Sequence, residues 1–168
     1  MHHLVIRPEQ PEDAPAISAL VRTAFLTQPH SNANEATIVE RLRDRGELTV
    51  SVVALRDGEL VGHVAFSPVT LTPMTSRWFG LAPLSVLPQQ RHRGLGAALV
   101  MRGLSQLRML KAHGCVVYGC AAYYRRFGFR RWECISYAGG EAANFLAMAF
   151  EHSPPRASVT YSPAFHGD

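Results

Sequence analysis

The stretch QRHRGLGAAL, residues 90–99, places two arginines, a histidine and two glycines directly before an apolar run. A helix that begins here leaves its first backbone N–H groups without acceptors and carries partial positive charge at that end. Glycines permit a tight turn and a close ligand, and Arg91, His92 and Arg93 add donors suited to phosphate. The stretch therefore predicts an anion site at a helix start, although a solvated basic turn between a strand and a helix would contain the same residues.

Length and composition bound the class of protein. The chain has 168 residues, 47% of them hydrophobic and 18% charged, so we expect one domain over residues 1–168 that buries about two-thirds of its unfolded surface. No charged-then-apolar leader is present, and no apolar run approaches the roughly 18 residues that a membrane helix needs. We therefore expect a soluble cytoplasmic protein that has no membrane partner.

The cysteines and histidines do not form a metal motif. Cys115, Cys120 and Cys134 are too few and too irregularly spaced for a disulfide framework or a tetrahedral zinc site. The eight histidines include no His-Glu-x-x-His pattern, and the sequence has no Cys-x-x-Cys pair. We therefore expect no metal.

The distribution of charge tells more than the net charge of +4. No carboxylate occurs between residues 60 and 132, whereas ten arginines and lysines do. Such a stretch gives a positive potential to any cleft that it lines. Nucleic acid, a membrane surface or a phosphate-rich cofactor would each bind to such a cleft. If the arginines are instead spread evenly around the surface, they form no binding site.

The spacing of apolar residues predicts an α+β fold. Strands are predicted at residues 4–8, 48–55, 60–69, 78–88, 115–119, 144–150 and, with the weakest pattern, 159–165. Helices are predicted at residues 12–25, 35–46 and 121–129, and a long one from Gly94 with Gly114 as its C-cap. Asp57-Gly58 predicts a hairpin turn between the second and third strands.

Two common phosphate-binding motifs do not match the glycine turn. A Rossmann fingerprint needs a third glycine where Leu99 stands, and a Walker loop needs Gly-Lys-Ser/Thr. The pattern Arg91-x-x-Gly94-x-Gly96, preceded by Val86 and Pro88, instead resembles motif A of the GNAT superfamily of N-acetyltransferases.

A second block supports the same resemblance. In YYRRFGF, residues 123–129, Tyr124 stands four residues before Gly128 and Phe129, as in the superfamily's Tyr-x-x-x-Gly-Phe signature. The resemblance extends over residues 4–132 and is strongest to a bacterial subgroup whose substrates are largely unassigned. It implies a central, mixed and mostly antiparallel twisted sheet of six to seven strands, flanked by about four helices.

The resemblance also implies a cofactor site. The strand that ends near Val86 and the strand at 115–119 are expected to splay apart, with acetyl-CoA as co-substrate in the opening. The pantetheine would pair with the backbone of residues 84–86, and the diphosphate would lie on the N–H groups of residues 92–97. The implied cofactor-binding residues are Leu84, Ser85, Val86, Arg91, His92, Arg93, Gly94, Leu95, Gly96 and Ala97. Arg125 and Arg126 would either bind the 3′-phosphate or act structurally.

Acetyl transfer from a thioester to an amine needs a protonated leaving thiolate and a stabilised oxyanion. Tyr124 matches the superfamily's general acid, since a phenol with a pKa near 10 can donate to a thiolate whose conjugate acid lies near 8.5. Its neighbour Tyr123 is expected to serve packing. A backbone N–H near Val86 would polarise the thioester carbonyl.

The general base is less evident, because many relatives place a carboxylate on the strand before motif A. Residues 78–88 contain none. Glu35 and His63 are the candidates for the base. Each also suits a structural role, Glu35 as a charge at a helix start and His63 as a buried histidine in a strand. A water relay to backbone carbonyls and Ser85 is the remaining route.

Cys120 departs from the subgroup, which tends to have Asp-Pro where this chain has Cys120-Ala121. A thiol here would either accept the acetyl group covalently, which would give ping-pong kinetics, or serve as a small packed residue.

The sequence thus predicts an acetyl-CoA-dependent N-acetyltransferase that moves an acetyl group directly to a primary amine of a small molecule or protein. The alternatives are a non-catalytic acyl-CoA-binding regulatory domain and a nucleic-acid-binding module; the second lacks a recognition motif, so no nucleic-acid partner is expected. Acceptor specificity is expected near residues 26–34 and in the C-terminal strands. The sequence leaves the oligomeric state open, with a homodimer as one alternative because many relatives dimerise.

Overall fold

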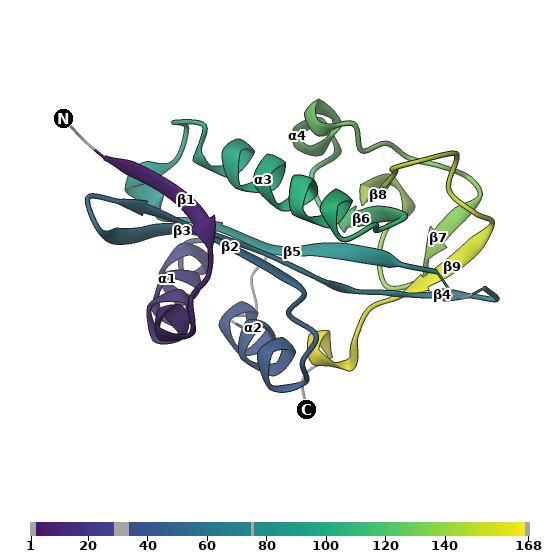
Figure 1. Ribbon diagram of the computed structural model, residues 1–168. Helices are drawn as coiled ribbons and strands as arrows, with labels where there is room; N and C mark the ends of the chain where they lie inside the picture. The colour runs from purple at the N-terminus through teal and green to yellow at the C-terminus, as the bar shows by residue number, and fades with distance from the viewer. Residues whose placement is uncertain (1–2, 29–33, 75, 167–168) are drawn as a thin grey trace.

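A central sheet forms the middle layer of the computed structural model, which describes residues 3–28, 34–74 and 76–166 (Figure 1). Within these residues the sheet has six strands in the order β1-β2-β3-β5-β6-β8. Their bounds are Leu4–Pro8 for β1, Val50–Arg56 for β2, Glu59–Pro68 for β3, Trp78–Val86 for β5, Gly114–Tyr118 for β6 and Phe145–Ala149 for β8. All neighbours are antiparallel except β5 and β6, as expected for a mixed, mostly antiparallel sheet.

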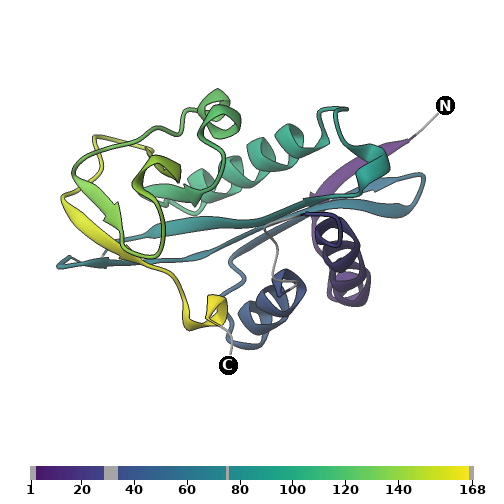
Figure 2. The same cartoon turned by 180° about the vertical axis from the view of Figure 1, so that it is seen from behind.

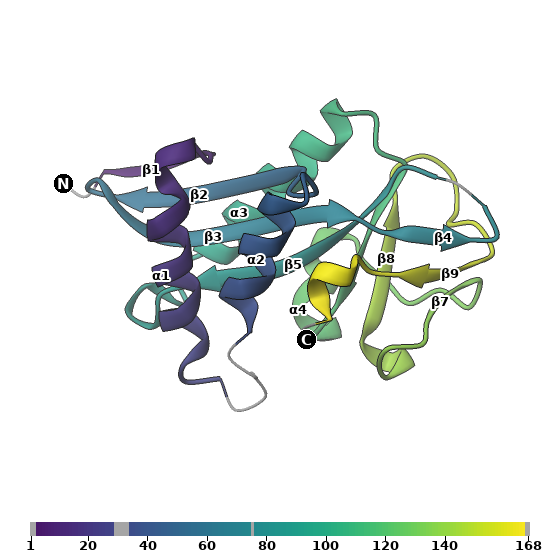
Figure 3. The same cartoon turned by 90° about the horizontal axis from the view of Figure 1, so that it is seen from below.

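Helices cover both faces of this sheet. The helix α3 (Leu95–Met109) lies on one face, and α1 (Ala14–Phe25) and α2 (Glu35–Asp44) lie on the other (Figures 2 and 3). Apolar residues at helical spacing explain this arrangement: Leu99, Leu104 and Leu107 of α3 are buried against the sheet. On the opposite face Ile17 and Val39 pack on the sheet with Val53. A fourth, short helix, α4 (Ala121–Tyr124), follows β6.

The parallel strands β5 and β6 separate as predicted. They pair only from Trp78↔Gly114 to Gly80↔Val116, while β5 continues to Val86. The pairing of β5 with β3 is irregular over the same region, where the register shifts between Val64 and Phe66. The free backbone of the second half of β5 therefore faces an opening in the sheet.

A second sheet differs from the predicted architecture. In the described part of the chain it has three strands in the order β4-β9-β7, with bounds Thr70–Thr72, Ala157–Thr160 and Ile135–Tyr137 respectively. The strand predicted at 159–165 is therefore wrong in its second half, where Pro163 begins a 3-10 turn instead. Proline lacks the N–H that a strand ladder needs.

The predicted C-cap is also wrong. The helix α3 ends at Met109, and Lys111 adopts the left-handed φ of +63°. Gly114 is instead the first residue of β6, where a Cβ would collide with the ring of Trp78. This glycine permits close packing of two strands and does not end the helix.

Candidate active site

A cavity of about 470 Å³ lies where β5 separates from β6 and α3 begins. It is lined by Ala24, Phe25, Gln28, Leu84, Ser85, Val86, Gln90, Arg91, His92, Gly94, Leu95, Gly96, Ala97, Tyr123 and Arg126. These include every predicted cofactor residue except Arg93, whose side chain is exposed. We refer to it as the cofactor cavity. The geometry thus brings the predicted residues together around one hollow.

The start of α3 forms the electropositive wall of the cofactor cavity. Gly94 is the N-cap residue with a left-handed φ of +82°, and no side chain caps the helix. The first intrahelical hydrogen bond runs from the N–H of Ala98 to the carbonyl of Gly94 at 3.0 Å. The N–H groups of the first helical turn are therefore not used within the helix and suit an anion.

Arg91 connects the cofactor cavity to the rest of the fold. Its Nε donates to the carbonyl of Val86 at 3.2 Å, and its Nη2 donates to the carbonyl of Ala24 at 2.8 Å. The guanidinium therefore joins the end of β5 to the last turn of α1 while it lines the cavity. Sequence reasoning assigned this residue to charge pairing with the cofactor and missed its structural bonds.

The two neighbouring tyrosines take different places. Tyr124 packs edge-on against Phe129, with ring centroids 5.9 Å apart, and burial raises the pKa of its phenol, so the hydroxyl remains protonated at neutral pH. It is not among the residues lining the cofactor cavity, whereas Tyr123, expected to serve packing, is. The Oη atom of Tyr123 lies 2.6 Å from the position that a Cβ on Gly96 would occupy. The glycine leaves the space into which the phenol projects.

The two arginines after Tyr124 also differ. Arg126 lines the cofactor cavity and places its Cζ 4.5 Å from the centroid of the Tyr123 ring. Arg125 is exposed and does not line the cavity. Of the predicted pair, only Arg126 is therefore placed to contact a ligand in that cavity.

A second cavity, of about 750 Å³, shares Phe25 and Gln28 with the first. Its lining residues are Phe25, Gln28, Glu35, Tyr118, Gly119, Glu141 and Asn144. We call it the acceptor cavity, after the role that we propose for it below. It contains the candidate base Glu35 at the start of α2. Sequence reasoning missed Glu141, whose backbone N–H donates to Tyr118 Oη at 3.0 Å. Of the loop expected to determine acceptor specificity, residues 29–33 lie outside the described residues.

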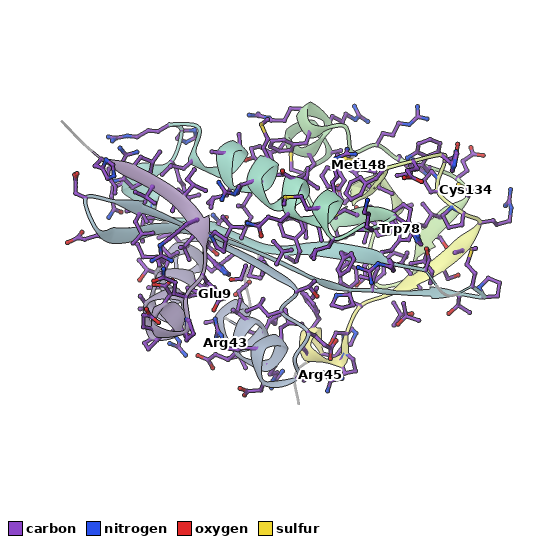
Figure 4. All side chains as sticks on the ribbon, viewed as in Figure 1. Glu9, Arg43, Arg45, Trp78, Cys134 and Met148 are labelled. Atoms are coloured by element: carbon purple, nitrogen blue, oxygen red, sulfur yellow. The ribbon has the colours of Figure 1, made fainter. Side chains whose placement is uncertain are left out.

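The other candidate base, His63, is sealed inside the fold. Its side chain is fully buried, and its Nε2 lies 2.8 Å from Ser51 Oγ. Desolvation, together with the nearby Arg43 guanidinium, lowers the pKa of His63 to about 3, so the imidazole is neutral. That guanidinium forms an ion pair with Glu9 at 3.0 Å (Figure 4). His63 lines neither the cofactor cavity nor the acceptor cavity.

Cys120 is exposed at the N-cap of α4, and its carbonyl accepts the N–H groups of Tyr123 and Tyr124 at 3.1 Å each. Among the described residues, no three His, Cys, Asp or Glu side chains gather in a way that could hold a metal ion. No helix in the described ranges is both long enough and apolar enough to cross a membrane.

Comparison with known proteins identifies the class that this fold and these cavities define. A family model described as an acetyltransferase (GNAT) domain matches residues 5–132. The chain therefore belongs to the GNAT family of acetyltransferases, as its motifs predicted, and it is an N-acetyltransferase by class.

Two relatives from Escherichia coli K12 are similar over most of the chain. The uncharacterized N-acetyltransferase YhbS is 43% identical over 127 residues, which are 75% of this chain and 73% of YhbS. The uncharacterized N-acetyltransferase YjhQ is 31% identical over 133 residues, covering 77% of this chain and 71% of YjhQ.

Two solved structures share the fold over nearly the full length. A GNAT family acetyltransferase from Brucella melitensis, solved in complex with acetyl-CoA, is 42% identical with a TM-score of 0.88. The match covers 98% of this chain and 99% of that one. Escherichia coli YhbS, solved in complex with CoA, is 33% identical with a TM-score of 0.88, over 99% and 94% of the two chains.

Proposed function

We propose that this enzyme transfers an acetyl group from acetyl-CoA directly to a primary amine. The observation that carries the proposal is that two cavities lined by side chains of opposite charge have Phe25 and Gln28 in common in their walls. One contains a free helix start and two arginines, and the other contains two glutamates. An anionic cofactor and a cationic acceptor fit these cavities respectively, and their reacting groups would meet at the shared wall.

The cofactor cavity is proposed to hold acetyl-CoA, because two full-length structural relatives were solved with acetyl-CoA or CoA. The diphosphate would lie at the start of α3 on the N–H groups of Gly94–Ala97, with His92 and Arg93 nearby. The pantetheine would run along Leu84–Val86, whose backbone faces the opening between β5 and β6.

The proposed reaction has two proton transfers, one to the leaving thiolate from Tyr124 and one from the amine to Glu35. The amine nitrogen forms a bond to the thioester carbon, and a backbone N–H near Val86 stabilises the oxyanion. The C–S bond then breaks, the Tyr124 hydroxyl protonates the leaving thiolate, and the resulting phenolate regains a proton from solvent. Burial raises the pKa of this phenol, so the hydroxyl is protonated when the thiolate leaves but is a weaker acid than an exposed tyrosine.

Glu35 is proposed as the group that takes the proton of the amine. It lines the acceptor cavity, where an amine would stand, whereas His63 is buried and lines neither cavity. An imidazole with a pKa of about 3 would also hold a proton poorly at neutral pH. We therefore assign His63 to the core.

The acceptor is proposed to be a small molecule or a protein that presents a primary amine. No observation favours the non-catalytic regulatory alternative. A cytoplasmic location is part of the proposal, since acetyl-CoA is the donor. A homodimer remains a prediction from the family resemblance, and light scattering of the purified protein tests it.

The experiment that tests the proposal is a screen of amines for release of free thiol from acetyl-CoA, with mass spectrometry of the products. Release that depends on one amine, with a product heavier by one acetyl group, is expected. The Cys120→Ala variant should give the same rate, since direct transfer has no acetyl-enzyme intermediate. Thiol release without acetylated amine, or inactivation of Cys120→Ala, would contradict direct N-acetyl transfer.

A further inference from the structure

The side chain of Tyr123 projects over the start of α3 inside the cofactor cavity. Its Oη lies 2.6 Å from the position of a Cβ on Gly96, while its Cζ lies 3.8 Å from the same position. The hydroxyl is therefore the part of the ring that comes nearest to the helix start. A phenolic O–H is thus placed beside the backbone N–H groups that suit an anion.

Three neighbours hold the Tyr123 ring in this orientation. Arg126 places its Cζ 4.5 Å from the ring centroid, and its Nε donates to the carbonyl of Tyr123 at 3.1 Å. Tyr124 and Phe127 pack edge-on against the ring, with centroids 5.0 and 5.5 Å away. A ring held by an arginine and two aromatic edges loses little further freedom when a ligand binds.

We infer that Tyr123 is a ligand of the cofactor's diphosphate, to which its hydroxyl donates a hydrogen bond at the start of α3, with Arg126 beside it as the balancing charge. This inference rests on the proposed function, because it takes acetyl-CoA as the occupant of the cavity. The two adjacent tyrosines then have different roles: Tyr124 protonates the sulfur, and Tyr123 donates a hydrogen bond to the diphosphate.

The ionisation of Tyr123 agrees with a donor role. Partial burial raises the pKa of its phenol against the opposing effect of Arg126, so the O–H is intact at neutral pH. A neutral donor to a phosphate oxygen forms a charge-assisted hydrogen bond, which is stronger than one between neutral groups.

Binding of truncated ligands tests the inference. Acetyl-CoA, its analogue without the 3′-phosphate and S-acetylpantetheine would be titrated into the wild type and Tyr123→Phe, by calorimetry or ligand-observed NMR. Tyr123→Phe should weaken binding of the first two about tenfold, the loss expected for one charge-assisted hydrogen bond. Binding of S-acetylpantetheine, which lacks the diphosphate, should be unchanged. Tyr137→Phe, which also removes a phenol hydroxyl but lines neither cavity, is the matched control and should bind all three ligands as the wild type does.

The outcomes distinguish a failure of the Tyr123 role from a failure of the proposed acetyltransferase function. A wild type that binds no acetyl-CoA would overturn the proposed function. A wild type that binds it, with Tyr123→Phe equally tight, would overturn only the Tyr123 assignment. Equal weakening for S-acetylpantetheine would place the hydroxyl on the pantetheine, and weakening only when the 3′-phosphate is present would place it there; either would overturn the diphosphate assignment.

A double-mutant cycle provides a second test that does not depend on one variant. Gly96→Ala brings a Cβ against Tyr123 Oη, and without that oxygen the next contacts, to Tyr123 Cζ and Leu84 Cδ2, are at 3.8 Å. Gly96→Ala should therefore weaken acetyl-CoA binding less in the Tyr123→Phe background than in the wild type. Additive losses would overturn the placement of the hydroxyl at the helix start. Circular dichroism and melting temperature confirm that each variant is folded.

Discussion

The cofactor cavity and the acceptor cavity share two residues but are built in different ways. Most of the cofactor cavity comes from one continuous run, residues 84–97, and its described lining contains two arginines and no carboxylate. The acceptor cavity takes one or two residues from each of four separate places: the end of α1, the start of α2, the end of β6 and the turn before β8. Its described lining contains two glutamates and no basic residue. Most of the cofactor cavity thus comes from the acid-free centre of the sequence, whereas both glutamates of the acceptor cavity come from outside that centre.

The largest effect is expected on the cofactor side. Gly96→Glu would place a side chain against Tyr123 Oη and a negative charge beside the diphosphate. We expect calorimetry to show acetyl-CoA binding weakened at least about 100-fold. Ser105→Glu adds the same charge at an exposed position of the same helix and should bind normally. If Gly96→Glu bound acetyl-CoA with unchanged affinity, the cofactor would not bind in this cavity.

Tyr124→Phe tests the chemistry between the two cavities. Because only the proton donor is lost, kcat should fall about 100-fold while the Kd of acetyl-CoA stays the same. Steady-state rates with the amine found by screening, together with calorimetry, separate the two quantities. Full activity would mean that water or another group protonates the thiolate.

The dependence of stability on pH distinguishes a buried core histidine from a general base in a cavity, and His63 provides this test. Its pKa of about 3 in the folded protein lies below the unfolded value near 6.5, so the unfolded chain binds more protons between these pH values. Stability therefore falls as pH drops below about 6.5, by up to about 1.4 kcal/mol per pH unit. Asp13, whose pKa is also lowered, contributes its own loss only as pH falls below its unfolded value of 3.8.

Urea unfolding at pH 7 and pH 5 measures this dependence on pH. The loss of stability between the two values should be much smaller in His63→Gln than in the wild type. Equal losses in the two proteins would show that His63 is not the buried neutral group described above.

The smallest effect is expected on the acceptor side. Glu141 is exposed at the rim of its cavity, where water screens its charge. Glu141→Gln should raise KM for a cationic amine about fivefold and leave kcat unchanged. Glu133→Gln removes a charge at an exposed position outside both cavities and should leave KM as it is. An unchanged KM for the cationic amine in Glu141→Gln would contradict the assignment of a cationic acceptor to this cavity.

The residues that the sequence motif groups together also line one cavity in the fold, because they are close together in the chain. Gly94 has a left-handed φ, which glycine adopts more readily than other residues. Gly96 leaves space for the hydroxyl of Tyr123, which a Cβ at this position would contact. Both requirements are local, so motif spacing reveals them. The long helix and the pairing of β2 with β3 follow from apolar periodicity and the Asp57-Gly58 turn in the same way.

The remaining features depend on contacts between distant segments. Glu141 contacts Tyr118 across 23 residues, and nothing near either residue indicates the other. Tyr123 and Tyr124 have the same local pattern, and only the tertiary packing decides which one lines the cavity. The strands β4 and β7 have three residues each, too few for a period to appear in the sequence.

The position of β9 in the second sheet also has a consequence for synthesis of the chain. Thr70–Thr72 and Ile135–Tyr137 do not pair with each other, and each pairs with Ala157–Thr160 instead. At about 5–20 residues per second, translation takes roughly 4–18 s between Thr72 and Thr160, and during this time β4 has no partner strand. Leu71, buried in the finished protein, meanwhile remains open to solvent and to other nascent chains. Synthesis of β9 therefore supplies the strand that pairs with β4 and ends the time in which β4 has an unpaired edge open to other chains.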